Sequence, residues 1–120
     1  MKNNLVARIA GIIYALVLVP FGINHFKNAP AMAGIVPIPG GVVWVYITGA
    51  AFILAAIAFI INFKVRLAGY LLGLLLLIIA VTMHLMPCLK GTDADMHFSQ
   101  FLKDTGLAAA AFFIGSVSAK

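Results

Sequence analysis

Residues 42 to 61 read VVWVYITGAAFILAAIAFII, an apolar run in which no side chain carries a charge. A helix needs about 20 predominantly apolar residues to cross the roughly 30 Å of hydrocarbon in a bilayer. Trp44 and Tyr46 stand near the start of the run, and aromatic side chains of this kind favour the boundary between lipid and water. The stretch therefore predicts one membrane-spanning helix.

The remainder of the chain is built in the same way. Its 120 residues include eight basic and three acidic residues, which separate uncharged runs at 9–26, 28–63, 67–89 and 105–119. Hydrophobic residues make up 64% of the chain and charged residues 9%, whereas soluble domains draw on about 25% charged residues. The composition predicts an integral membrane protein whose solvent is the lipid bilayer. Because the basic residues lie beside apolar runs and form no patch, no nucleic-acid partner is expected.

Prolines, glycines and charges divide the chain into four expected spans. We predict a single domain over residues 1–120, an all-α membrane protein with four transmembrane helices in an antiparallel bundle at about 4–26, 42–61, 67–85 and 93–118. Pro20 and Gly22 are expected to loosen the outer end of the first helix, and Pro87 is expected to end the third. The fourth helix is expected to begin near Asp93, where Thr92-x-x-Asp95 has the form of a capping box.

The connections between the spans are short. Residues 27 to 41 hold Pro30, Pro37 and Pro39, which exclude a long helix, and the apolar piece Met32 to Val36 is expected to rest at the membrane surface. The first apolar stretch resembles a signal peptide but exceeds the usual length of about 7 to 15 apolar residues, so we expect it to be retained as a helix. No internal repeat or low-complexity segment is evident in the sequence.

The distribution of basic residues predicts the orientation of the spans. The N-terminus, the turn at residues 62–66 and the C-terminus hold five basic residues and no acidic ones, whereas the other two loops hold three basic residues beside all three aspartates. Basic residues accumulate on the cytoplasmic side of a membrane. Both termini are therefore expected to be cytoplasmic.

This orientation gathers polar side chains at the outer end of the bundle. His25 would end the first helix and His84 the third, while His97 precedes the membrane part of the fourth. At 100° per residue, four polar side chains of the fourth helix fall within about 60° and form one stripe, namely Asp93, His97, Gln100 and Asp104. Ionisable groups at membrane depth normally turn toward protein or water, so we expect the stripe to face inward.

Asp104 is the member of the stripe that most needs a partner. It lies near the expected hydrocarbon boundary, where an unpaired charge is costly. The neighbouring Lys103 points about 100° away around the helix. We expect the partner of Asp104 to be a histidine, a hydroxyl or an amide from a neighbouring helix, namely His25, His84, Thr82 or Asn24.

Three interpretations of the polar cluster are open. Histidines and aspartates at helix ends can be purely structural, forming caps and hydrogen bonds. A histidine, whose ordinary pKa is about 6.5, can also exchange protons with the carbonyl of a quinone head group. A metal site of His25, His84, His97 and an aspartate is the third interpretation, but no HxxxH or HxxE pair fixes two ligands on one helix, so no metal is expected. Cys88 is the only cysteine, which excludes an intrachain disulfide and a CxxC redox pair.

Small residues form a second feature of the chain. They recur at helical spacing and let helices approach closely, at Gly11, Ala15, Gly69, Gly73, Ala111 and Gly115. Such faces can close the bundle itself, or they can pack against another membrane protein or a second copy of the chain. The alternative function is therefore that of a non-enzymatic accessory or assembly subunit.

Five short motifs follow one another along nearly the whole chain. They are Arg8-Ile-Ala, Phe21-Gly-Ile-Asn-His-Phe26, the Pro37/Pro39-Gly-Gly turn before Val42, Thr82-Met-His-Leu85 and Leu102-Lys-Asp-Thr-Gly-Leu107. In their order and spacing these motifs resemble the DoxX family of small bacterial membrane proteins with four helices. The resemblance implies a multi-pass protein of the bacterial cytoplasmic membrane.

The resemblance also implies a function. The best-known DoxX proteins are small subunits of thiosulfate:quinone oxidoreductase, and other members are associated with membrane redox balance. The expected function is therefore a component of a quinone-linked membrane redox system, and any enzymatic activity would be that of a subunit of such an oxidoreductase. We expect a quinone to bind in a polar pocket at the outer end, where the cofactor-binding residues would be Asn24, His25, His84, His97, Lys103 and Asp104.

Overall fold

The computed structural model describes residues 5–34, 39–91 and 93–118, and all regular elements in these ranges are helical. In chain order they are α1 (Leu5–Lys27), α2 (Ala29–Ala33), α3 (Gly41–Ile61), α4 (Val65–Ile79), the π-helix η1 (Ala80–Leu85), α5 (Met86–Leu89) and α6 (Ala94–Ser116). The elements α4, η1 and α5 follow one another without a break as one long helix, Val65–Leu89.

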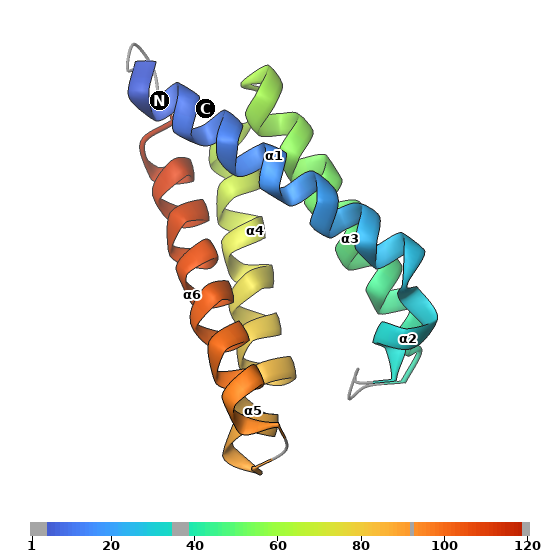
Figure 1. Cartoon of the computed structure of the whole chain (residues 1–120). Coiled ribbons are helices and arrows are strands. Elements are labelled where there is room, and N and C mark those ends of the chain that lie inside the picture. The colour runs from blue at the N-terminus through green and yellow to red at the C-terminus, as the bar shows by residue number, and fades with distance from the viewer. Residues whose placement is uncertain (1–4, 35–38, 92, 119–120) are drawn as a thin grey trace.

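The helices form two antiparallel hairpins rather than one evenly packed bundle. The first hairpin pairs α1 with α3, and the second pairs α4 with α6 (Figure 1). The hairpins meet near the start of α1, the end of α6 and the turn between α3 and α4, and they separate toward α2 and α5 (Figure 1). The polar residues predicted to gather at one end of the molecule lie on this separating side.

Three helices among the described residues are long and apolar enough to cross a membrane. They are Leu5–Lys27, Gly41–Ile61 and Val65–Leu89. The helix α6 matches α1 in length, at 23 residues, but it carries Asp95, Lys103 and Asp104. The structure thus supports a multi-pass membrane protein with three candidate spans.

Small residues let the two helices of each hairpin approach closely. A Cβ atom added to Gly69 of α4 would lie 2.6 Å from the carbonyl oxygen of Ala111 in α6, and one added to Gly49 of α3 would lie 3.1 Å from the carbonyl oxygen of Gly22 in α1. All six small residues singled out from the sequence are buried within the chain, namely Gly11, Ala15, Gly69, Gly73, Ala111 and Gly115. These faces are therefore used inside the protein.

An arginine joins the two helices of each hairpin at the end where the hairpins meet. The guanidinium of Arg8 in α1 donates to the carbonyl oxygens of Phe59 and Ile60, at the C-terminal end of α3. Nη2 of Arg66 in α4 donates to the carbonyl oxygen of Ser118 just beyond α6, at 2.8 Å. The last carbonyls of a helix have no partner within the helix, and a cation there also complements the helix dipole.

The two hairpins repeat each other. The segment Arg66-Leu-Ala-Gly69 matches Arg8-Ile-Ala-Gly11, 58 residues earlier. The positions 58 residues after the four buried residues of α1 are also buried. Gly11, Ala15, Leu18 and Gly22 thus correspond to Gly69, Gly73, Leu76 and Ala80. The six buried residues of α3 recur at an offset of 59, so that Val45, Gly49, Phe52, Ala55, Ala56 and Phe59 correspond to Asp104, Ala108, Ala111, Ile114, Gly115 and Ser118.

The likeness of the two hairpins was not evident in the sequence. The two copies share few identical residues, and their likeness lies mainly in which positions are buried, which only the structure reveals. The offset grows by one residue between the two comparisons, in the part of the chain that holds η1 and the loop before α6. A π turn accommodates one extra residue in a helix.

One further expectation about a helix end needs correction. Pro87 does not end the third span, because the helix continues to Leu89. A proline ring crowds the carbonyl four residues earlier, and the wider turn of η1 just before Pro87 relieves that crowding. The expected capping box depends on Thr92, which lies outside the described residues. Asp93 precedes α6 in a left-handed conformation without a side-chain cap.

The first loop contains the short helix α2, which begins with Pro30 in its first turn. This agrees with the expectation that the segment holds no long helix. The apolar piece Met32 to Val36, expected at the membrane surface, lies partly outside the described residues, and Pro37 lies outside them entirely. α1 remains helical through Pro20 and Gly22 to Lys27.

Candidate functional site

A cavity of about 360 Å³ lies between the two hairpins on the side where they separate. Its polar lining comes from both, with Asn24, His25 and Thr48 from the first hairpin and His84, Gln100, Lys103 and Asp104 from the second. Its apolar lining is Phe21, Met32, Trp44, Val45, Phe52, Leu76, Ile79, Met83 and Leu107. The volume and the mixture of apolar walls with a few polar groups are typical of small-molecule sites. We call this space the central cavity.

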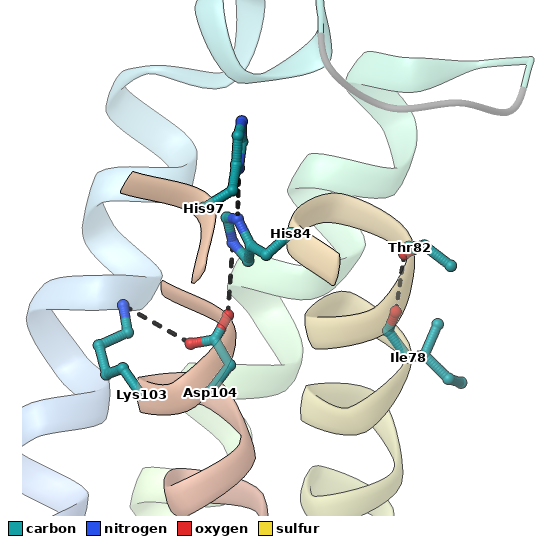
Figure 2. A network of polar contacts seen from close by, with 6 residues as sticks. All are labelled: Ile78, Thr82, His84, His97, Lys103 and Asp104. Atoms are coloured by element: carbon teal, nitrogen blue, oxygen red, sulfur yellow. Dashed lines mark hydrogen bonds and ion pairs between the residues drawn. The ribbon is translucent and has the colours of Figure 1, made fainter. Parts of the chain in front are cut away.

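A chain of polar contacts forms one wall of the central cavity (Figure 2). Nδ1 of His97 lies 3.1 Å from Nδ1 of His84, and Nε2 of His84 lies 3.5 Å from Oδ2 of Asp104. The other carboxylate oxygen of Asp104 lies 3.5 Å from Nζ of Lys103. His84 belongs to η1 and the other three residues belong to α6, so the chain of contacts joins the two helices of the second hairpin.

The chemistry of the donors and acceptors indicates which ring nitrogens carry the protons in this series of contacts. A carboxylate only accepts, so the contact with Asp104 favours a proton on Nε2 of His84. A neutral imidazole with a proton on Nε2 accepts at Nδ1, so His97 donates from its own Nδ1. The other ring nitrogen of His97 points away from His84, toward the end of the molecule that holds α2 (Figure 2). The second hairpin thus presents a carboxylate, an ammonium and the ring of His84 to the central cavity, and His97 stands behind His84.

Burial explains why Asp104 needs these partners. Only 6% of Asp104 and 7% of His97 is exposed, and a buried carboxyl group requires a compensating charge or hydrogen-bond donors. The prediction that Asp104 meets a histidine of a neighbouring helix is confirmed for His84. The predicted inward stripe is also confirmed for His97, Gln100 and Asp104, whereas Asp93 is exposed because α6 begins only after it.

Among the described residues, Thr82 and Asn24 make other contacts and none with Asp104. The hydroxyl of Thr82 donates to the carbonyl oxygen of Ile78 at 2.7 Å (Figure 2), and the side-chain oxygen of Asn24 accepts from the amide of Asn28.

The expectation that Lys103 points away from Asp104 needs correction. Its ammonium reaches Asp104 although the two residues leave the helix in different directions. The flexible four-carbon side chain of lysine makes this possible. The same ammonium lies 4.9 Å above the ring of Phe21 in α1, a cation–π contact that links the two hairpins. Phe21 was not among the predicted site residues, since no spacing within one segment signals a contact between hairpins.

His25 occupies the opposite wall of the central cavity. Its Nδ1 lies 2.7 Å from the carbonyl oxygen of Phe21, and its ring meets Phe52 edge to face, with centroids 5.1 Å apart. His25 precedes His84 by 59 residues, the offset at which the later part of the repeat aligns. At that offset the first hairpin has Val45 where the second has Asp104. The two histidines are therefore equivalent in position but differ in their surroundings.

The predicted site residues thus divide into two groups. Five of them line the central cavity, namely Asn24, His25, His84, Lys103 and Asp104. His97 does not line the cavity and instead stands behind His84. Among the described residues, no group of three histidine, cysteine or acidic side chains is arranged to hold a metal ion.

Comparison of the chain with protein-family models, with curated proteins and with solved structures gives no match.

Proposed function

We propose that the protein is a DoxX-like component of a quinone-linked redox system in the bacterial cytoplasmic membrane, and that the central cavity binds the head group of a quinone. On this proposal α6 forms the fourth span, with its polar face turned to the cavity. The burial of His97 and Asp104 supports this placement, because it removes two polar side chains from the lipid-facing surface of α6.

The observation that carries the proposal is the composition of the cavity wall. A quinone head group is a flat apolar ring with oxygens on opposite sides, so it needs an apolar slot with hydrogen-bonding groups at its ends. The cavity combines aromatic and aliphatic walls, such as Phe21 and Trp44, with the polar groups of Gln100 and Lys103.

Protein purified gently from membranes is expected to retain ubiquinone or menaquinone, detectable by solvent extraction and chromatography. Lys103→Met removes a charged donor from the cavity wall and should lower the affinity for quinone roughly tenfold or more. Lys90→Met is the matched control, because Lys90 is exposed beyond α5. Repeated absence of quinone from the unaltered protein, without quinone-dependent activity in membranes, would argue against the proposal.

The alternative of an accessory subunit lacks a specific surface in its favour. The six small residues that motivated it are buried within the two hairpins. Quinone-free protein that crosslinks to one defined partner in native membranes would restore this alternative.

The proposed orientation, with both termini in the cytoplasm, makes a prediction about Cys88. The half-buried thiol of Cys88 lies in α5, at the end of the molecule opposite to the turn between α3 and α4 (Figure 1). A membrane-impermeant thiol reagent should therefore label Cys88 in intact spheroplasts. In a Cys88→Ala background, Lys64→Cys should react only after lysis, since Lys64 is exposed in that turn. The reverse pattern would invert the proposed topology.

A further inference from the structure

The central cavity presents a hydrogen-bond acceptor on its first wall. A carbonyl oxygen can only accept, so the contact between Nδ1 of His25 and the oxygen of Phe21, at 2.7 Å, places a proton on Nδ1. Neutral imidazole carries a single ring N–H, which leaves Nε2 with a lone pair and no proton. Within the described ranges, no group donates a hydrogen bond to Nε2 of His25. Because His25 lines the cavity, Nε2 is the ring position at which this residue could accept from a ligand.

Lys103 of the second hairpin presents a donor to the same cavity. Nζ of Lys103 carries three protons and no lone pair, and its contacts with Asp104 and the ring of Phe21 leave it room to donate to a further acceptor. His84 is not free in the same way, because both of its ring nitrogens already face partners, Asp104 and His97. The cavity thus has an acceptor at His25 and a donor at Lys103, and both residues line it.

A site with one acceptor, at His25, and one donor, at Lys103, discriminates between the two stable redox forms of a quinone. In the oxidised form both oxygens are carbonyls and can only accept, so the lone pair of His25 would face another lone pair. In the reduced form both oxygens are hydroxyls, which can donate and accept. We infer that the central cavity selects the hydroquinone, with one hydroxyl donating to Nε2 of His25 and the oxygen at the other side of the ring accepting from Nζ of Lys103. The inference rests on the proposed quinone site and adds which form of the ligand that site holds.

The size of the preference follows from the cost of an unpaired polar group. Leaving one hydrogen-bonding group of a binding site without its partner lowers affinity by roughly tenfold or more. Decylubiquinol should therefore bind at least about tenfold more tightly than decylubiquinone to the full chain in lipid nanodiscs at pH 8, where an ordinary imidazole is neutral. Titration calorimetry gives both affinities, and the fluorescence of Trp44, the only tryptophan and a residue of the cavity wall, gives an independent signal.

Two variants test the role of His25 directly. His25→Gln supplies an amide that can donate or accept, so the preference should fall to near unity, mainly through tighter binding of the quinone. His25→Phe removes the acceptor and should weaken hydroquinone binding while changing quinone binding little. Asp95→Asn is the control that should retain the preference, because Asp95 is exposed and lies outside the cavity.

The outcomes separate this inference from the proposed function. Binding of neither form would overturn the quinone site itself. Equal affinities, a preference for the quinone, or an unchanged preference in His25→Gln would overturn the selection of the hydroquinone while leaving a quinone site in place. Nitrogen-15 NMR of the unaltered protein gives a test that needs no variant, since a proton found on Nε2 of His25 instead of Nδ1 would also overturn it.

Discussion

Gly69→Ala is expected to destabilise the protein by about 1 to 3 kcal/mol, the usual cost of forcing an extra methyl group into a packed interior. The added Cβ would lie 2.6 Å from the carbonyl oxygen of Ala111 and 2.9 Å from the backbone nitrogen and Cα of Gly115. All three are backbone atoms, so no change of rotamer relieves the clash. The helices α4 and α6 would have to move apart, and denaturation in detergent should report the loss.

Gly106→Ala is the matched control for this prediction. Gly106 lies in the same hairpin, but a Cβ atom there would meet nothing within 4 Å. Alanine is favoured over glycine inside a helix by about 1 kcal/mol, so this variant should be as stable as the unaltered protein or slightly more so. Equal stability of the two variants would show that α4 and α6 do not approach as closely as described.

Asp104→Asn is expected to cost about 1.5 to 3 kcal/mol of stability, the range for a hydrogen bond to a charged group, and to weaken hydroquinone binding. The amide keeps the shape of the carboxylate but lacks its charge, so Lys103 loses its counter-ion and His84 keeps only a neutral acceptor. The ammonium of Lys103, the proposed donor to the hydroquinone, would then lose the contact that positions it. The free energy of unfolding and the affinity for decylubiquinol measure the two effects separately.

Asp95→Asn provides the comparison on the same helix. Asp95 is exposed in the first turn of α6, where its charge interacts favourably with the helix dipole. Losing that interaction costs less than about 1 kcal/mol. If the protein tolerates both substitutions equally, Asp104 does not have the structural and binding role assigned to it.

The extents of the helices could be predicted from sequence because they depend on a one-dimensional signal. The uncharged run at 42–61 became α3, Gly41–Ile61, and the first expected span at 4–26 became Leu5–Lys27. The pairing into two separate hairpins could not be predicted in this way. It depends on which small residues meet across helices, such as Gly69 against Gly115, and sequence spacing does not say which faces meet.

The candidate site was predictable in kind but not in detail. The helical periodicity placed Asp104 on an inward face, where its carboxylate needs a partner. The sequence did not favour either His25 or His84 as the histidine that contacts it. Which histidine contacts Asp104 depends on the local geometry of η1, the π-helix that contains His84. No residue pattern in the sequence predicted this π-helix. The helical periodicity also placed Lys103 by the direction of its Cβ, whereas the position of its ammonium depends on four further bonds.

The likeness of the two hairpins bears on how the cavity came to have two unlike walls. If each hairpin were a separate molecule, two identical copies would pair about a symmetry axis, and every residue facing the axis would occur twice. Such a pair could not place Asp104 on one wall without a second aspartate in the position of Val45. The turn that joins α3 to α4 makes the halves parts of one chain, so each can change without the other. A single chain can therefore set a donor against an acceptor across one cavity, which a symmetric pair of hairpins could not do.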